Sequence, residues 1–388
     1  MENHQIKNII FVNAQTQYEN LGDVIILKTL LEKLRNYGNL IIDERYIPAW
    51  LNQELEIKNA EKASEYNSKF LILVLSFAIK SLFNPHTQIY YFLNPGHYLS
   101  RVLRNQQYIK HLITTIKTVV FLTILKILGV RICRLGVSIG PFSKIDQIVE
   151  VWLSKIMYCY SVRDTKSEKY AKQLGINKVE IFPDMAWLMK TPKLEQKILE
   201  SEDDYVIFSF RKATNPHDDP NTYKTKLFPV LDEIVNTVCV NWQKRLVISY
   251  QVETDYEFCQ EISHRYKDNY NVTFIEQSIN SHNIYELYSR AHMVFSNRLH
   301  VLMFSMVCNS LPIAVVDGIK HDKITGLYSD AGLNQLIIDI SNEVPVRDFL
   351  NQMNTNYHAA KEKTALCIKN KQQLGDAIIR RVMMPEAQ

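Results

Sequence analysis

The segment that most constrains how this chain can fold runs from Met293 to Gly318. It opens with the apolar residues 293–295, which predict a short buried strand, and Ser296-Asn297 then supply a turn and a helix cap. The apolar residues after this turn predict a helix, and a second apolar strand, 313–316, ends at Asp317-Gly318. The segment therefore predicts a strand–helix–strand unit.

Arg298 and His300 stand in the first turn of the predicted helix. The free N–H groups and the dipole at a helix N-terminus attract anions, and an arginine there adds a planar fork that suits phosphate and carboxylate. A lone histidine is by default a core residue with satisfied hydrogen bonds. The arginine beside His300 favours an acid–base role instead, so we predict that this turn is the centre of an active site.

Strands and helices alternate along most of the 388 residues, a pattern typical of parallel sheets with helices on both faces. The polar and charged segment 191–204 breaks the alternation and is the best candidate for a linker. We therefore predict an N-terminal domain over residues 1–190 and a C-terminal domain over 200–345. A helical tail over 346–388 is expected to pack back on the first domain.

Composition and spacing exclude several classes of protein. The net charge is only +4 and there is no Lys/Arg block, so no nucleic-acid partner is expected. The six cysteines are scattered, as is typical of reduced thiols in a cytoplasmic protein, and the N-terminus lacks a secretion signal. His97, His217 and His321 do not have metal-ligand spacing, so no metal site is predicted.

Two apolar stretches, 70–83 and 112–130, resemble membrane segments in composition. Lysines interrupt both, at Lys80 in the first and at Lys117 and Lys126 in the second, and neither reaches about 18 uninterrupted apolar residues. Buried core helices are the preferred interpretation. The alternative is a pair of membrane-surface helices whose lysines lie near the lipid headgroups.

The N-terminal region begins like a dinucleotide-binding unit, with a strand over 6–12 and a helix opening at Leu21-Gly22-Asp23. However, it has no G-x-G-x-x-G, and Asp23 stands where a pyrophosphate would need bare backbone amides. NAD and FAD are therefore not expected. Asp23 could also be only a favourable charge in the first turn of the helix.

Gly136-Val-Ser138-Ile-Gly140 matches the G-x-S-x-G elbow of α/β-hydrolases. That elbow requires a helix directly after the serine, whereas here Pro141 and a polar turn follow. We therefore interpret this segment as a turn at the end of a strand, in which glycines allow close backbone approach. Ser138 is not predicted to be a nucleophile.

Three arginines, Arg163, Arg211 and Arg298, each follow the end of an apolar strand. In an open α/β sheet, ligands bind at the carboxyl ends of the strands, so these side chains could converge on one anion. The alternative for each is a structural salt bridge, and for Arg163 the neighbouring Asp164 makes the two interpretations equally good. Asp184, after a predicted strand at 179–182, could simply brace a turn.

Several of these motifs occur together in an order that resembles the polysaccharide pyruvyl transferase family. They cover roughly residues 8–335, and the Arg-Leu-His element is the most specific among them. Residues 50–130 contain no motif that can be placed, and the family often has a glycine-rich turn where this chain has residues 94–97. The motifs are Asn20-Leu-Gly-Asp23, Gly136–Pro141, Ser161-Val-Arg-Asp164, Pro183-Asp184, Asn297-Arg-Leu-His300 and Asp317…Lys323.

The resemblance implies an α/β protein with two Rossmann-like, doubly wound domains facing a cleft, similar to GT-B glycosyltransferases. It implies phosphoenolpyruvate as co-substrate, no other cofactor, and transfer of a pyruvyl group to a sugar as a ketal. On this basis His300 is the expected acid and Asp23 the base. The expected donor-binding residues are Arg298, Arg211, Arg163, Leu299 and Lys323, and the expected cleft turns hold Gly22, Gly136, Gly140, Asp184 and Asp317.

Two other functions are compatible with the same residues. A GT-B glycosyltransferase would grip the diphosphate of a nucleotide sugar with the arginines, and a non-catalytic member would serve assembly of a polysaccharide-synthesis complex. The expected partner is a glycan or lipid-linked sugar acceptor, with the enzyme in the cytoplasm and peripheral contact with the inner face of the membrane as one option. The sequence does not indicate the acceptor sugar or the oligomeric state.

Overall fold

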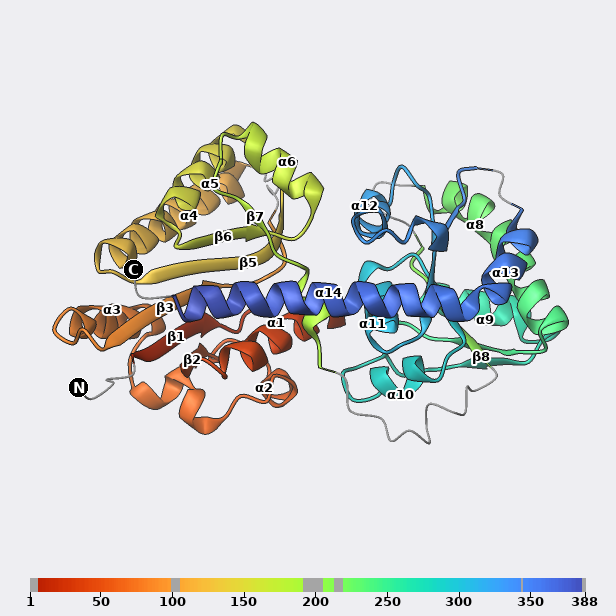
Figure 1. Cartoon of the computed structure of the whole chain (residues 1–388), viewed down its shortest axis with the longest axis horizontal. Helices are drawn as coiled ribbons and strands as arrows, with labels where there is room; N and C mark the ends of the chain where they lie inside the picture. Colours follow the sequence, from red (N-terminus) through yellow and green to blue (C-terminus); the bar gives the residue numbers. More distant parts are fainter. Residues whose placement is uncertain (1–5, 99–104, 191–204, 213–218, 343–344, 386–388) are drawn as a thin grey trace. The chain divides into compact units, whose positions relative to one another are not determined.

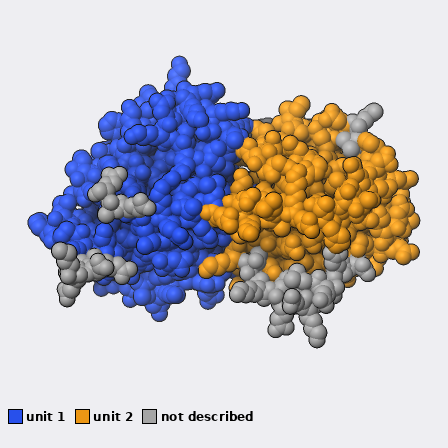
Figure 2. Space-filling model, viewed as in Figure 1, with its two compact units in different colours: residues 1–18, 23–188, 374–388 blue, residues 19–22, 189–373 orange. Residues whose placement is uncertain are grey.

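The computed structural model describes residues 6–98, 105–190, 205–212, 219–342 and 345–385. The chain forms two compact units (Figure 2). Unit 1 consists of residues 1–18, 23–188 and 374–388, and unit 2 of residues 19–22 and 189–373. The predicted linker, 191–204, lies outside the described residues.

Unit 1 is built on a parallel sheet in the order β2-β1-β3-β5-β6-β7, with the short β4 paired to β5 (Figure 1). The direction in which successive strands are added reverses between β1 and β3. The loops after these two strands therefore diverge at the carboxyl ends of the strands. The strands are β1 (Lys7–Asn13), β2 (Asn39–Asp43), β3 (Thr87–Leu93), β4 (His97–Tyr98), β5 (Arg131–Ile139), β6 (Cys159–Val162) and β7 (Glu180–Ile181).

Helices cover both faces of this sheet, because its strands are apolar on both sides. One face packs against α3, α4, α5 and α6 around a core that includes Phe11, Tyr91 and Ile132. The helices of unit 1 are α1 (Leu21–Leu34), α2 (Ala49–Glu54), α3 (Phe70–Ser81), α4 (Asn105–Ile127), α5 (Lys144–Ile156) and α6 (Thr165–Gln173), with 3₁₀ turns at η1 (Asn59–Glu61), η2 (Ala63–Tyr66) and η3 (Met185–Leu188).

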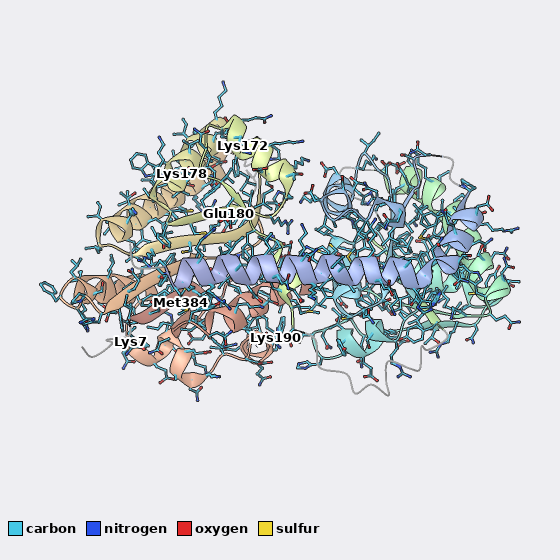
Figure 3. The ribbon with its side chains drawn as sticks, viewed as in Figure 1. Lys7, Lys172, Lys178, Glu180, Lys190 and Met384 are labelled. Atoms are coloured by element: carbon cyan, nitrogen blue, oxygen red, sulfur yellow. The ribbon has the colours of Figure 1, made fainter. Side chains whose placement is uncertain are left out.

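The C-terminal part of α14 (Tyr357–Met383) packs within unit 1, where the Tyr90 hydroxyl donates to the Val382 carbonyl at 3.2 Å. Lys33 of α1 pairs with Asp376, Nζ to Oδ1, at 2.6 Å. Glu180 of β7, labelled in Figure 3, pairs with Arg381 at 2.5 Å. These contacts fix residues 374–383 to the same sheet as the N-terminal strand.

Unit 2 is a second parallel sheet, in the order β10-β9-β8-β11-β12-β13. This is the strand order of the dinucleotide-binding Rossmann fold, and the order reverses between β8 and β11. The strands are β8 (Tyr205–Ser209), β9 (Arg245–Ile248), β10 (Val272–Phe274), β11 (Met293–Ser296), β12 (Leu311–Val316) and β13 (Ile337–Asp339).

The strand–helix–strand unit predicted from 293–318 is confirmed, with β11 and β12 paired in parallel and α11 between them. The helices of unit 2 are α8 (Pro220–Val235), which continues into a π-helical segment η4 (Asn236–Asn241), α9 (Tyr256–Tyr266), α10 (Ile284–Ser289), α11 (Leu299–Val307), α12 (Asp322–Asp330), α13 (Val346–Thr355) and the first part of α14, with 3₁₀ turns at η5 (Glu253–Asp255) and η6 (Asn334–Leu336).

The prediction that the apolar stretches 70–83 and 112–130 form buried core helices is wrong for one face of each helix. In α4, Leu122 and Leu125 are buried, but Ile116 and Val120 are about half exposed. The physical reason is that each helix lies on the sheet with one face only, while its sequence is apolar on the outer face as well. None of the helices in the described ranges is long and apolar enough to cross a membrane.

Candidate functional site

The candidate site lies at the carboxyl edge of the unit 2 sheet, where the strand order reverses. Ser209 of β8 and Ser296 of β11 are paired in register, and each is followed two residues later by an arginine, Arg211 and Arg298. Open α/β sheets bind ligands at this kind of reversal, because the loops of the two strands leave in opposite directions. The fold therefore brings together two of the three predicted arginines.

Asn297 locks the ends of the two strands to each other. Its Oδ1 accepts from the backbone N–H of Arg211 at 2.9 Å, and its Nδ2 donates to the Arg211 carbonyl at 2.9 Å. The same Nδ2 also donates to the Tyr223 hydroxyl at 2.8 Å, and the amide is fully buried. Because this amide makes a two-way bridge, the backbones that carry Arg211 and Arg298 are held at a fixed separation.

A buried carboxylate orients Arg298. The guanidinium NH2 of Arg298 donates to Oδ1 of Asp255, whose side chain is 5% exposed. Burial raises the pKa of Asp255, and the charges of Arg298 and Arg211 oppose that rise. Both arginines therefore act on this one carboxylate, and Asp255 fixes the direction of the Arg298 fork.

Polar atoms are buried at this edge without partners among the described residues. They are Nε of Arg298, Oγ of Ser249 and Nε2 of Gln251, and the last two follow the end of β9, the neighbour of β8. A buried polar atom without a hydrogen bond is costly, so such atoms are typical of a site that a ligand completes.

His300 lies in the first turn of α11, which begins at Leu299. Arg298 occupies the N-cap position with no side-chain cap bond, so the predicted cap by Ser296-Asn297 is wrong. The imidazole stacks on the ring of Phe304, one turn further along the helix, with centroids 5.8 Å apart. The predicted pair of cation and imidazole is therefore placed at the N-terminus of an apolar helix.

Gly22 lies against the imidazole of His300. A Cβ built on Gly22 would lie 1.9 Å from the imidazole Nδ1, so the ring packs directly on the start of α1. The Asn20 Oδ1 accepts from the Gly22 N–H at 3.1 Å and caps this helix. Asp23, the predicted base, is the next residue along the chain.

We expect Gly22→Ala to lower kcat by about tenfold to a hundredfold, because the added Cβ displaces the imidazole by roughly 1 Å. The clash also reaches Cγ of the imidazole at 2.5 Å, so the whole ring must move. Gly326→Ala in α12 is the matched control, because a Cβ there meets nothing within 4 Å. Equal kcat values for the two variants in steady-state assays would contradict the role of this contact.

Asp317 and Lys323 follow β12, next to β11 in the sheet. Asp317 is buried, and its Oδ1 accepts from the backbone N–H groups of Ile319 and Lys320 at 3.3 and 3.2 Å. It therefore braces the turn, while Lys323 is exposed in the first turn of α12. Their predicted roles in binding remain predictions.

The remaining predicted residues lie in unit 1. Arg163 donates through Nε to the Ser138 hydroxyl and through NH1 to Oδ2 of Asp184, both at 2.5 Å. The Ser138 hydroxyl in turn donates to Asp164 at 2.7 Å. Arg163 is thus held in an internal network of unit 1, the geometry of the structural alternative, whereas Arg211 and Arg298 belong to unit 2.

Two glycines with positive φ lie near this network. The prediction of a turn over residues 136–140 is wrong for most of the segment, because β5 continues to Ile139 through an irregularity between Arg134 and Val137. Gly136 has φ +61°, and a Cβ there would lie 2.7 Å from the Phe182 ring. Gly140 has φ +77°, and its Cβ would collide with the Tyr170 ring. Both positions therefore require glycine. Ser138 between them lies inside β5, and the next helix starts only at Lys144, so the geometry of a nucleophile elbow is absent from this described segment.

A model of the polysaccharide pyruvyl transferase family matches residues 20–309, which include Arg211, Asp255, Arg298 and His300. The chain belongs to this family. No curated protein sequence matches it. The matched segment begins at Asn20, which caps α1, and it also contains Gly22 and His300, which pack against each other.

Solved structures with a similar fold include the Neisseria meningitidis UDP-GlcNAc 2-epimerase bound to UDP-GlcNAc, with TM-score 0.56 and 12% identity over 97% of this chain and 99% of that chain. A glycosyltransferase from Rickettsia africae ESF-5 has TM-score 0.56 and 10% identity over 99% and 100%. At this identity the likeness concerns the fold alone. It confirms the predicted GT-B-like fold of two parallel-sheet α/β domains.

Sequence analysis missed Asp255, Asn297 as a bridge, and Tyr223. Asp255 stands 43 residues before Arg298, and only the adjacency of β9, β8 and β11 brings the two together. Its position in the sequence could have indicated it, because Asp255 directly precedes helix α9 in the loop after a buried strand. In the described ranges, no three His, Cys, Asp or Glu side chains are grouped so as to hold a metal ion.

Proposed function

We propose that this member of the family transfers the pyruvyl group of phosphoenolpyruvate to two hydroxyls of a sugar in a bacterial surface polysaccharide or its lipid-linked precursor. The products are a pyruvate ketal and phosphate. The observation that carries the proposal is the pair Arg211 and Arg298 at the strand reversal of unit 2, with His300 at the start of α11. No cofactor beyond the donor is required for this reaction.

The donor carries a phosphate and a carboxylate, and each suits one guanidinium fork. Arg298, held by Asp255, and Arg211, held by Asn297 through its backbone, bind these two groups. The N-terminal amides of α11 add a favourable dipole for the anion. Bound in this way, the enol carbons of the donor lie next to the imidazole of His300.

The reaction begins with transfer of a proton from His300 to the terminal enol carbon, which becomes a methyl group. The first sugar hydroxyl forms a bond to the adjacent carbon and loses its proton to Asp23. The bond from this carbon to the phosphate oxygen then breaks and phosphate leaves. The second hydroxyl attacks the same carbon and gives its proton to the imidazole of His300, which restores the acid. Atoms and charges balance with one phosphate released for each ketal formed.

The test is incubation of the purified protein with phosphoenolpyruvate and candidate acceptors, namely a lipid-linked oligosaccharide, a nucleotide sugar and a wall-polymer precursor. We expect one acceptor to gain the mass of pyruvate minus water, with an equal amount of phosphate released. Phosphoenolpyruvate at about 100 times its Kd should stabilise the fold by about 2.7 kcal/mol in thermal unfolding. Stabilisation by a nucleoside diphosphate sugar, with no response to phosphoenolpyruvate, would favour a glycosyltransferase instead.

A further inference from the structure

The helices α3, α4 and α5 of unit 1 carry an exposed apolar surface that the proposed chemistry does not use. Among the described residues, 25 large apolar side chains are exposed, and 14 of them lie on these helices or in the two residues after α3. The described part of unit 2 contributes only three. Because soluble surfaces rarely concentrate apolar side chains in this way, the surface marks an interaction site.

The surface is organised along α4 as one continuous stripe. Its exposed apolar residues recur every three or four positions, which places them on a single face of the helix. Leu122 and Leu125 are buried and face the sheet instead. The stripe consists of Ile109, Ile113, Ile116, Val120, Ile124 and Ile127, which are between 41% and 77% exposed.

Helix α5 extends the stripe sideways. The indole Nε1 of Trp152 donates to the Thr123 hydroxyl of α4 at 3.3 Å, so this half-exposed ring lies beside the stripe. Ile148, one turn earlier on the same face of α5, is 72% exposed. An apolar patch with an amphipathic indole at its border is typical of surfaces that sit at a membrane interface.

The charges around this surface have one sign. Of the two acidic residues in the described parts of the three helices, Glu150 is buried against Arg134, and Asp146 is 18% exposed and accepts from the imidazole of His111 at 3.2 Å. The exposed charged side chains on these helices, together with Lys69 at the N-cap of α3, are all lysines: Lys69, Lys80, Lys110, Lys117, Lys126, Lys144 and Lys155.

We propose that the α3–α4–α5 face of unit 1 docks on the surface of a bilayer that contains anionic lipid. The apolar stripe enters the headgroup region and the lysines contact the lipid phosphates. A second copy of the chain is a poorer occupant, because a two-fold interface places the same patch on both subunits and would bring lysines against lysines. Docking of this kind holds unit 1 close to molecules anchored in the same membrane. The proposal does not depend on the reaction proposed above.

Flotation with vesicles of phosphatidylcholine alone, or of phosphatidylcholine with phosphatidylglycerol, tests the proposal. We expect the full-length protein to float only with the anionic vesicles. Ile116→Glu/Val120→Glu should abolish flotation, whereas Val240→Glu/Leu366→Glu, two exposed apolar positions of unit 2, should leave it unchanged. Lys110→Gln/Lys117→Gln/Lys126→Gln should lower the partition coefficient by roughly a hundredfold, about fivefold for each lysine.

Thermal unfolding of every variant shows whether the fold is retained. If the glutamate variant does not fold, the lysine variant alone tests the proposal. The proposal is overturned if the wild-type protein floats with neither vesicle, or if the glutamate or lysine variants float as well as the wild type. It is also overturned if light scattering finds a wild-type dimer that Ile116→Glu/Val120→Glu converts to a monomer. In that case the stripe is an interface between two copies of the chain.

Discussion

His300→Ala lowers ketal formation by about two to four orders of magnitude, the range that a positioned general acid contributes. The enol carbon of the donor is a weak base, so the step stalls when no acid stands beside it. Donor affinity should change little, because Arg298 and Arg211 remain. The measurement is kcat from phosphate release, together with the shift of the unfolding temperature by phosphoenolpyruvate.

The matched control is His264→Ala, which removes an exposed histidine from α9 in the same unit. It should leave both kcat and donor stabilisation unchanged. If His300 donates the proton, kcat of the wild type should fall on the alkaline side of its pH profile. The profile of His300→Ala should lack this fall. Near-normal turnover in His300→Ala would remove His300 from the mechanism while leaving the family membership intact.

The sequence was sufficient to predict the elements of the site, because they depend on local patterns. The apolar run before Ser296 and the apolar helix after it both depend on neighbours within a few residues, and the structure confirms them. The predicted cap at Ser296-Asn297 is wrong, because the helix starts one residue later, with Arg298 at the N-cap and no side-chain cap bond. The GT-B-like fold was predicted from the alternation of strands and helices together with the family's motifs. In that fold Arg211 and Arg298 each follow, by two residues, the paired Ser209 and Ser296 at the ends of adjacent strands.

What could not be predicted depends on contacts between distant residues. Strand order decides that β9, β8 and β11 are neighbours, and no local pattern in the sequence specifies it. The Asp255 partner of Arg298 follows from that order alone. Likewise, the apolar content of α4 is the same whether its outer face is covered or exposed, so composition favoured a buried helix where the structure has an exposed stripe.

The second large effect concerns stability. Arg298→Ala should destabilise the protein by about 3–5 kcal/mol near neutral pH, because it leaves the buried carboxylate of Asp255 without its ion-pair partner. Arg265→Ala, which breaks a half-exposed pair with Asp232 in the same unit, is the matched control and should cost at most about 1 kcal/mol. Equilibrium unfolding in urea measures both.

The pH dependence of this loss follows from the direction of the pKa shift. Burial raises the pKa of Asp255 in the folded state, and Arg298 opposes the rise, so removing Arg298 raises that pKa further. A group with a raised folded pKa stabilises the protein when it is protonated, and this contribution is lost as the pH rises through the folded pKa. The cost of Arg298→Ala should therefore be largest at neutral and alkaline pH and shrink as the pH falls into the acidic range.

The double variant Arg298→Ala/Asp255→Asn distinguishes the effect of the buried charge on stability from the effect of the missing guanidinium on donor binding. The double variant holds no uncompensated carboxylate, so we expect it to recover about 0.5–3 kcal/mol relative to Arg298→Ala and to lose the added pH dependence. Donor stabilisation should remain absent, because the guanidinium is missing. If the double variant is no more stable than Arg298→Ala at any pH, then lost packing around the arginine, and not the buried charge of Asp255, is the source of the destabilisation.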